Sequence, residues 1–561
     1  MNPEFPIGNR SRTRFLLLAL ILLLAAGLRF YRLSDMGYRF GDEGYHLMYS
    51  ILYLMHHDEP FLYFKHGLHL FIAFGIVLFD LDQAGSLCWS AVCGLLTILL
   101  FYGFTSQLAN QRAALFAAFA MAVSKYILFY HRSNMSDGYA LLFFCMTSIF
   151  LIFAFRGLGF LPSVSGRQSE PGRILSWSVV VLAGLLIGFC FTVRIQTCLI
   201  LIGSLFALAL TLGVATNRRN TGRFLVLSGG LLLLGGVGYA ATMFLLHDNI
   251  KWESTVEWYA KNFGIGRQSP EVWAPYPLIH LWSFCGWPLI VIAVTYLVYA
   301  TVRIRSRGIA LRWLLVYSWG LLVLFLYMGL PWPRAHVYLA FYLCIFWGLA
   351  MDQASAAVAR MSRRIRYAGA LGIAILCVLT AGAEIRKAKT LITGKGGYLE
   401  TMQYLLANGI GDGIVTTHAW PIFRAEHRHL TTVLYEFPEH LHDADEGQVF
   451  IQFLRGRTIY ENATHMVLDV HIPYACTPEQ QRFLQRFCAT YPPDMLVVND
   501  FACDPQTCQD AFKVTFPESM FSRYNIVYDL RRFAAKDFEL KPLAPFTTNA
   551  EMTTLMLAGR K

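Results

Sequence analysis

The chain has 561 residues, of which 56% are hydrophobic and only 15% are charged. Soluble domains carry about 25% charged residues, so this composition excludes an ordinary soluble protein and predicts a polytopic membrane protein. The 47 Lys and Arg against 36 Asp and Glu give a net charge of +11. Most of this excess falls in short loops between apolar runs, which is typical of cytoplasmic loops and does not indicate nucleic-acid binding.

The first apolar run, residues 15–33, follows Arg10, Arg12 and Arg14 and lacks a small-residue cleavage site. We therefore expect a retained transmembrane helix with its N-terminus in the cytoplasm. Further runs of spanning length, roughly 17–25 residues, follow along the chain. They lie at 85–108, 113–131, 137–155, 175–193, 195–216, 225–246, 277–302, 311–330, 335–352 and 367–384. The prediction is about eleven transmembrane helices.

A shorter run, HGLHLFIAFGIVLF at 66–79, decides the topology, because counting it as a span inverts every later loop. If it lies along the outer surface of the membrane, the arginine clusters at 217–223, 303–307 and 360–366 fall in the cytoplasm. The positive-inside rule therefore predicts an interfacial segment here. The rule also predicts that the region from about 385 lies on the extracytoplasmic (periplasmic) side. We expect a multi-pass protein of the cell's inner (plasma) membrane.

Hydrophobicity drops in the tail, where the strand-like runs GIVTTH, HMVLDVHI, DMLVVND and YNIVYDL alternate with helical ones. This pattern predicts a small soluble α/β domain at 385–561. Residues 1–384 then form a transmembrane module whose first outer loop, 34–84, includes interfacial helices.

Four of the 12 cysteines lie in this tail: Cys476, Cys488, Cys503 and Cys508. In an oxidising compartment such a cluster predicts up to two disulfides. A zinc site is the rival interpretation, although the spacing contains no paired C-x-x-C.

The topology places many polar residues in the outer loops. They include Asp42, Glu43, His46, Lys65, His66, Arg132, Asp137, Arg194, Tyr259, Arg334 and His336. Solvated carboxylates, and arginines that extend to lipid headgroups, are the simpler interpretations. However, basic residues at outer membrane ends run against the charge rule, and ionisable residues in such places are often functional.

Acids and cations gathered in an outer pocket suit glycosyl transfer from a lipid-linked phosphate sugar. A carboxylate would deprotonate the acceptor hydroxyl and direct it at the anomeric carbon. Cations would neutralise the phosphate as it leaves. A membrane-embedded donor also agrees with the lack of GxxxxGK[ST] and GxGxxG motifs in the sequence.

Four segments carry a family resemblance: GDEGYHLMYS at 41–50, and the longer stretches at 61–87, 110–144 and 184–201. They resemble GT-C glycosyltransferases of the family 39 type, which include protein O-mannosyltransferases and the lipid A aminoarabinose transferase. The resemblance covers roughly residues 15–350, and the tail is similar to the family's outer domain only in general character. The triplet Lys65-His66-Gly67 departs from the proline-containing signature of the family.

The resemblance implies a GT-C fold, a polyprenyl-phosphate sugar donor and an inverting single displacement. By position, Asp42 is the base or acceptor-orienting acid, Glu43 supports it and Asp137 is the second site acid. Lys65 and Arg194 bind the donor phosphate, with Arg132 and Arg334 as further candidates. His46, His66, His336 and Tyr259 complete the set of site candidates.

Several points stay open from the sequence. The acceptor can be a lipid, a polysaccharide or a protein, and the sugar is not specified. No cofactor is certain, and the hard oxygen ligands of Asp42, Glu43 and Asp137 leave a divalent metal open. Alternative functions are a flippase or transporter of lipid-linked saccharide, an oligosaccharyltransferase or polymer ligase, and a receptor.

Overall fold

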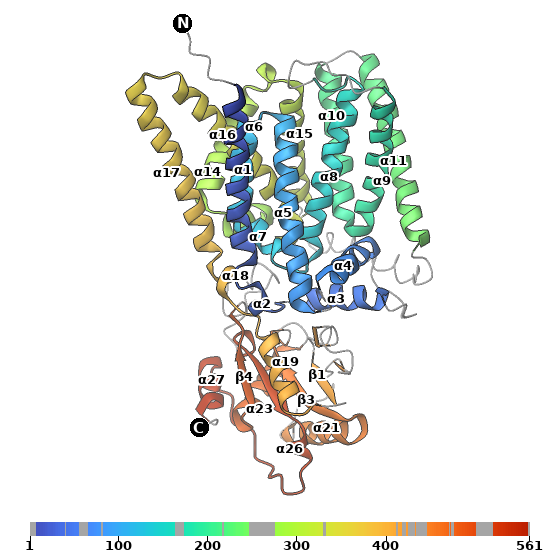
Figure 1. Ribbon diagram of the computed structural model, residues 1–561. Helices are drawn as coiled ribbons and strands as arrows, with labels where there is room; N and C mark the ends of the chain where they lie inside the picture. Colours follow the sequence, from blue (N-terminus) through green and yellow to red (C-terminus); the bar gives the residue numbers. More distant parts are fainter. Residues whose placement is uncertain are drawn as a thin grey trace. The chain divides into compact units, whose positions relative to one another are not determined.

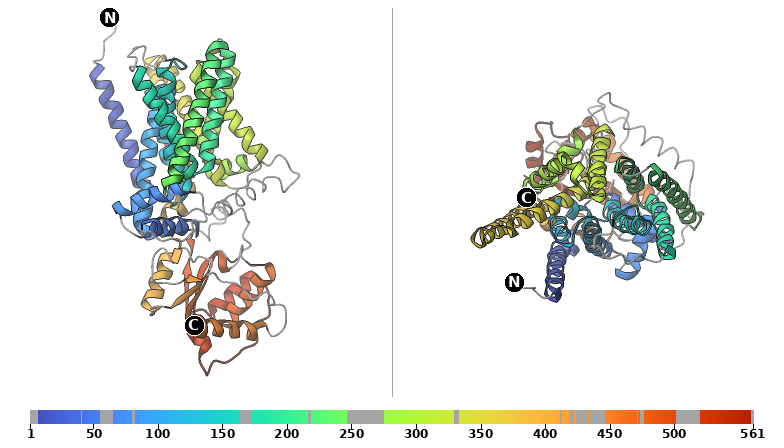
Figure 2. Two further views of the ribbon diagram at one scale, coloured as in Figure 1. Left: turned by 90° about the vertical axis from the view of Figure 1, so that its right-hand side faces the viewer. Right: turned by 90° about the horizontal axis from the view of Figure 1, so that it is seen from above.

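The computed structural model forms two compact units (Figures 1 and 2). The helical unit comprises Met1–Tyr31, Met55–Phe74 and Cys88–Lys389, and the C-terminal unit comprises Arg32–Leu54, Gly75–Leu87 and Thr390–Lys561. Segments of the expected first outer loop, 34–84, thus group with the C-terminal residues. The predicted boundary at 384/385 stays a prediction. The structure describes residues 7–39, 41–54, 65–79, 82–162, 173–215, 218–245, 275–328, 333–410, 413–417, 422–423, 432–433, 446–470, 472, 476–500 and 520–558.

The helical unit is built almost entirely from apolar helices. Those lying wholly or mostly in it are α1 (Ile7–Phe30), α4 (His66–Phe79), α5 (Gln83–Leu108), α6 (Gln111–Val123), α7 (Lys125–His131), α8 (Ser136–Gly157), α9 (Arg173–Val193), α10 (Ile195–Ala215), α11 (Arg218–Leu245), α13 (Tyr276–Phe284), α14 (Trp287–Val302), η2 (Ile304–Ser306), α15 (Ile309–Met328), η3 (Pro333–His336), α16 (Val337–Ala359) and α17 (Arg363–Lys387). In the described part of the chain, every run that the sequence marked as a span is therefore mainly helical.

Helix α16 lies at the centre of the unit, where it packs against α6, α14 and α17. The most apolar part of α16 is 78% buried, whereas the corresponding parts of α1 and α17 are only 17% and 11% buried. Figures 1 and 2 show α1 and α17 at the margin of the helices. Glycines allow the close packing of α9 on α11, since a Cβ on Gly188 would collide with the Gly235 carbonyl.

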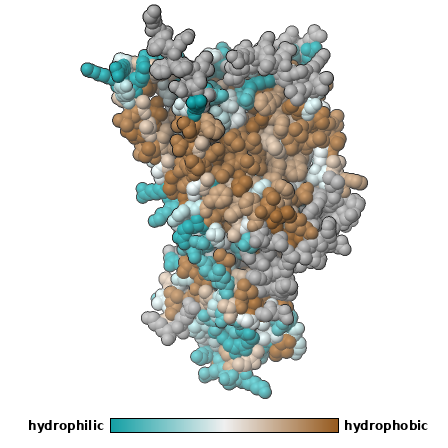
Figure 3. Space-filling model, in the orientation of Figure 1, coloured by the Kyte–Doolittle hydropathy of each residue, from teal (hydrophilic) through white to brown (hydrophobic). Residues whose placement is uncertain are grey.

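Large apolar side chains are exposed on the outer helices, among them Phe15 on α1, Val226 on α11 and Val378 on α17. Figure 3 shows such side chains over the helices on the face drawn. A soluble protein does not expose apolar surface of this extent, so these side chains face lipid. The chain is a multi-pass membrane protein.

Within the described residues, eight helices are long and apolar enough to cross a membrane, or nine if the bent pair α6 and α7 is one span. The expected number was about eleven. The difference concerns two expected spans. Helix α9 has 21 residues, but only its part Trp177–Val193 lies wholly within the described residues, and α14 has 16 residues. The second is short because the expected run 277–302 is broken at Cys285–Gly286 into α13 and α14.

Helix α4 has 14 residues, which corresponds to a length of about 21 Å at 1.5 Å per residue. The hydrocarbon core of a bilayer is about 30 Å thick. The helix is thus too short to cross it, in agreement with the expected interfacial segment at 66–79. The orientation of the chain in the membrane stays a prediction.

Two helix breaks inside the helical unit share one acidic side chain. Helices α6 and α7 meet at Ser124 with a bend of 65°. The buried Glu384 of α17 accepts from the backbone N–H of Lys125 at 2.8 Å and from the N–H of Gly286 at 2.5 Å. It thereby supplies an acceptor at the N-termini of both α7 and α14, where N–H groups lack partners within the helix.

Basic side chains donate hydrogen bonds to the free carbonyls at the C-terminal ends of helices. Lys387 Nζ, one turn beyond Glu384, donates to the carbonyls of Trp282, Ser283 and Cys285 at the end of α13, at 2.6, 3.2 and 2.8 Å. Arg29 donates to the Ala122 carbonyl at the end of α6 at 3.0 Å. These charges match the sign of the helix dipole at each end.

The C-terminal unit contains a five-stranded mixed sheet with strand order β2-β1-β3-β5-β4. Its strands are β1 (Ile414–Thr417), β2 (Thr432–Val433), β3 (Ala463–Leu468), β4 (Met495–Val498) and β5 (Tyr524–Asp529). Strands β1, β2 and β3 are parallel, and β5 runs antiparallel to β3 and β4. The four expected strand runs correspond to β1, β3, β4 and β5, so the α/β prediction is confirmed.

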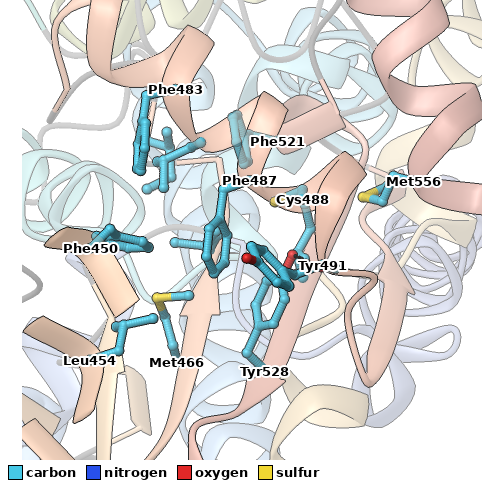
Figure 4. Close-up of a cluster of buried hydrophobic side chains, with 14 of the residues drawn as sticks. Phe450, Leu454, Met466, Phe483, Phe487, Cys488, Tyr491, Phe521, Tyr528 and Met556 are labelled. Atoms are coloured by element: carbon cyan, nitrogen blue, oxygen red, sulfur yellow. Dashed lines mark hydrogen bonds between the residues drawn. The ribbon is translucent and has the colours of Figure 1, made fainter. Parts of the chain in front are cut away.

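The helices of this unit are α2 (Leu33–Met36), α3 (Gly41–Leu54), α18 (Lys389–Thr393), α19 (Tyr398–Ala407), α21 (Glu446–Glu461), α23 (Pro478–Thr490), η4 (Met520–Ser522), α26 (Arg531–Ala534) and α27 (Asn549–Ala558). Alternate strand residues such as Met466, Ile526 and Tyr528 form a core with α21 and α23, to which Phe450 and Phe487 contribute (Figure 4). Phe487 contacts the Phe450 ring edge-on at 4.9 Å between centroids.

Cys476 and Cys488 are buried in this core as free thiols among the described residues. Burial raises the pKa of each thiol to about 12. Cys503 and Cys508 lie outside the described residues. The predicted disulfides therefore stay a prediction, and Cys476 does not pair with Cys488.

We expect Glu384→Leu to destabilise the protein strongly, because it leaves two buried backbone N–H groups without an acceptor. Each such group costs about 1–3 kcal/mol. Glu384→Gln keeps one oxygen acceptor and should cost less. Thermal unfolding of the protein in nanodiscs, followed by tryptophan fluorescence, measures both. Leu379→Ala, at a lipid-exposed position on the same helix, is the control, and wild-type stability of Glu384→Leu would contradict the capping role.

Candidate functional site

The best-defined polar site of the helical unit begins at the turn between α7 and α8. Ser136 and Asp137 open α8, and both are buried, with 1% and 0% exposure. A carboxylate in the first turn of a helix is favoured by the positive end of the helix dipole. The predicted site acid Asp137 is therefore held at a helix N-terminus inside the protein.

Arg194 is the partner of Asp137. It occupies the single-residue break between α9 and α10, and its guanidinium forms a buried ion pair with the Asp137 carboxylate. Arg194 Nη1 also donates to Ser136 Oγ at 3.2 Å, while Nε and Nη2 donate to Gln196 Oε1 at 2.8 and 2.6 Å. The structure thus brings together two residues that the sequence predicted for the site from separate outer turns.

Lys65 reaches the same hydroxyl from a third segment. Its Nζ lies 3.1 Å from Ser136 Oγ, to which it donates. Lys65 directly precedes α4, whose first turn packs against the end of α9: a Cβ on Gly67 would collide with Thr192 Oγ1. Glycine at this position, where the sequence departs from the family signature, therefore allows the close approach that places Lys65.

We call Lys65, Ser136, Asp137 and Arg194 the Ser136 cluster. It contains two cations and one carboxylate, so its formal charge is +1. Both cationic groups converge on one hydroxyl oxygen. Lysine and arginine arranged in this way suit a phosphate, with the guanidinium able to bind two oxygens at once.

Arg132 is buried and contacts another helix. Its Nη1 donates to the carbonyls of Leu28, Arg29 and Tyr31 at the end of α1, at 2.9, 2.9 and 3.1 Å. These bonds satisfy the C-terminal carbonyls of α1 and account for the burial of the guanidinium. The predicted role of Arg132 in phosphate binding stays a prediction.

The expected site residues of the 333–336 turn lie near α13. Arg334 is half-buried in η3. His336 is buried, and its Nδ1 lies 2.9 Å from Nδ1 of His280. Burial, aided by His280, lowers the pKa of His336 to about 3, so this imidazole is neutral at physiological pH.

The acidic first-loop residues belong to the C-terminal unit. Asp42 lies in the first turn of α3, and its side chain is outside the described residues. The buried Glu43 accepts from the backbone N–H of Arg39 at 2.6 Å. Burial lowers the pKa of Arg39 to about 10, with Glu43 acting in the opposite direction. His46, further along α3, is also buried.

Tyr259 lies outside the described residues. In the part of the chain that the structure describes, no three or more His, Cys, Asp or Glu side chains group to hold a metal ion. Because the Asp42 side chain is not included in that part, this finding leaves metal dependence untested.

Sequence reasoning did not single out Glu384, Lys387 or Arg29, which hold the helix breaks. Their position at the ends of apolar runs could have pointed to them, since ionisable residues in membrane proteins usually have a specific partner. Their partners are backbone groups up to 259 positions away in the chain, and the sequence alone does not identify these.

Comparisons with known proteins bear on the fold. No family model and no curated protein matches the chain. Among solved structures, the Archaeoglobus fulgidus oligosaccharyltransferase in the apo form matches with a TM-score of 0.57 and 13% identity, over 82% of this chain and 70% of that one. ArnT from Cupriavidus metallidurans bound to undecaprenyl phosphate matches with a TM-score of 0.51 and 14% identity, over 93% and 99%.

These similarities, together with the membrane helices and the C-terminal sheet, define a GT-C-like fold. The chain is a polytopic helical membrane protein with a C-terminal mixed α/β region, as the sequence predicted. At 12–14% identity the likeness concerns the fold.

We expect Arg194→Met to destabilise the protein, because it leaves the buried Asp137 carboxylate without its counter-charge. Removal of one partner of a buried ion pair costs about 3–5 kcal/mol. The double variant Arg194→Met/Asp137→Asn should regain most of that stability. Thermal unfolding in nanodiscs measures both, and equal losses in the single and double variants would show that the pair is not coupled.

We also expect stability to fall in mild acid, in part through His66. Burial lowers the pKa of His66 from 6.5 to about 4, so the unfolded chain binds a proton below pH 6.5 that the folded chain does not take up until about pH 4. Folding stability therefore decreases as the pH falls through this window, by roughly 2 kcal/mol between pH 6.5 and pH 5.

The variant His66→Gln should show a smaller decrease over the same pH range. Unfolding temperatures recorded at several pH values between 7.5 and 5 compare the two proteins. Identical pH slopes for wild type and variant would contradict a neutral, buried His66.

Proposed function

We propose that the protein is a polyprenyl-phosphate-sugar-dependent glycosyltransferase. The observation that carries this proposal is the Ser136 cluster, in which Lys65 and Arg194 converge beside Asp137 at a helix N-terminus of a GT-C-like fold. Two cations at an internal site of a membrane protein suit a lipid-linked phosphate better than a soluble nucleotide. In this assignment residues 1–384 are the catalytic module and 385–561 a soluble extracytoplasmic domain.

The proposed reaction is a single displacement at the anomeric carbon. Asp42 takes the proton of the acceptor hydroxyl, whose oxygen attacks the anomeric carbon as the bond from that carbon to the phosphate oxygen breaks. The electron pair leaves with the phosphate, and Lys65 and Arg194 stabilise the developing charge. Attack opposite the leaving group inverts the anomeric configuration.

The donor class is supported by two of the similar structures. ArnT was solved bound to undecaprenyl phosphate, and the archaeal oligosaccharyltransferase AglB was solved in complex with a dolichol-phosphate and an inhibitory peptide. By analogy with these two proteins, we propose that this chain uses a polyprenyl phosphate sugar as its donor. The acceptor is a hydroxyl of a lipid, polysaccharide or protein on the extracytoplasmic face.

A flippase or transporter of lipid-linked saccharide is the second candidate, since broken helices and buried ionisable residues are typical of transporters. Glu384 and Lys387 are such residues, and α6–α7 and α13–α14 are such breaks. Both side chains, however, bind backbone groups at the breaks themselves. Glu384 and Lys387 thus have a structural role and are not needed to explain transport, which favours the transferase.

The decisive assay follows the release of labelled sugar from a panel of polyprenyl-phosphate monosaccharides, with host membrane extract as acceptor. We expect release by the wild type and a loss of at least about 100-fold in Asp42→Asn, within the range of 10²–10⁴ for loss of a general base. Glu479→Gln, an exposed carboxylate on α23, is the control and should retain full activity.

Parallel reactions with EDTA show whether a divalent metal is needed. No release from any donor, together with movement of intact lipid-linked sugar across liposomes, would contradict the transferase and support the transporter.

A further inference from the structure

The segment that leads into α3 is fixed tightly within the C-terminal unit. Tyr38 is fully buried. Its backbone N–H donates to Gln83 Oε1 at 2.7 Å, and its hydroxyl lies 2.5 Å from Ser86 Oγ, at the start of α5. Two residues after Tyr38 comes Phe40, and α3 with Asp42 in its first turn begins at Gly41.

The same segment is held from the other side by a turn between α18 and α19. The backbone N–H of Gly396 donates to the Met36 carbonyl at 2.9 Å. A Cβ on Gly396 would collide with the Tyr38 carbonyl oxygen. Gly37 has a φ of +63°, and a Cβ there would come within 3.2 Å of Leu399 Cβ. Backbone packs directly on backbone, which leaves no room for a side chain at Gly396.

The turn at residues 394–397 is also held by hydrogen bonds to Asp500, which follows strand β4. The N–H of Lys395 donates to Asp500 Oδ2 at 2.9 Å, and the N–H of Asp500 donates to the Lys395 carbonyl at 3.0 Å. Asp500 follows β4, and a Cβ on Gly397, which has a φ of +78°, would meet the Val498 carbonyl at the end of β4 at 3.1 Å. A continuous set of contacts thus runs from β4 through residues 395–397 to residues 36–38.

The final link joins the first turn of α3 to the residues before it. Glu43 accepts from the Arg39 N–H at 2.6 Å and ties the start of the helix to the residues just described. Asp42 precedes Glu43 in this first turn. The position of Asp42 in the C-terminal unit therefore depends on the turn at 395–397.

From these contacts we propose that Gly396 is a positioning residue for Asp42, so that the C-terminal unit acts in the chemical step and not only in acceptor choice. This inference rests on the proposed function for the role of Asp42. The contacts do not involve the Ser136 cluster, and donor binding should not depend on them. A misplacement of 1 Å of a reacting group can cost about 100-fold in rate.

The test uses the whole chain in nanodiscs with Gly396→Ala, the milder variant Asp500→Ala, which removes the acceptor of the Lys395 N–H, and Gly456→Ala as control. Gly456 lies in α21 with open space around its Cβ position. Hydrogen exchange of the amides in residues 36–47 is measured in each protein, with the central helix α16 as internal reference. Sugar release at saturating donor, and the donor KM, are measured alongside.

We expect Gly396→Ala to exchange these amides at least about tenfold faster, since their protection depends on local opening, with α16 unchanged. We expect kcat to fall by about 100-fold with an unchanged donor KM. Asp500→Ala keeps the bond from its own N–H to the Lys395 carbonyl, so it should show the same changes at smaller size. It is the test variant if Gly396→Ala does not fold. The control should match the wild type.

Wild-type exchange rates in both variants would overturn the proposal, as would a fall in kcat without faster exchange. If the wild type itself releases no sugar, the proposed function fails, while the exchange result still decides whether the turn holds α3. The two failures are therefore distinguishable.

Discussion

The helical unit depends on the satisfaction of backbone polar groups at helix breaks away from water. In a bilayer no solvent pairs with free N–H and C=O groups, so each break needs a partner from the protein. Glu384 accepts from the N-termini of α7 and α14, and Lys387 donates to the end of α13. Arg29 and Arg132 donate to the ends of α6 and α1. Buried charges of the correct sign therefore fix where the helices turn.

This constraint determines where the candidate site forms. The bend at Ser124 sends α7 in a new direction, and the turn that follows α7 leads directly to Ser136 and Asp137. A second short break, at Arg194 between α9 and α10, supplies the cation that pairs with Asp137. Breaks that interrupt the helices thus place charged residues inside the protein, where an ion pair is less screened than at the surface.

Much of the fold could be predicted from the sequence because it follows from local patterns. Apolar runs mark the membrane helices, the short run at 66–79 is too short to span, and alternating runs mark β1, β3, β4 and β5. The partnership of Asp137 with Arg194 and Lys65 was expected only as membership of one outer pocket. Its geometry depends on tertiary packing, such as the contact of Gly67 with Thr192. The roles of Glu384 and Gly396 could not be predicted, because both act on backbone groups distant in the chain.

The proposed function requires that the Ser136 cluster bind the phosphate of a lipid-linked donor. Electron cryo-microscopy of the protein in nanodiscs with undecaprenyl phosphate tests it most directly. We expect phosphate density within hydrogen-bonding distance of Lys65 Nζ and the Arg194 guanidinium. Phosphate density at another site, with the contacts of Lys65 and Arg194 to Ser136 and Asp137 unchanged, would contradict it.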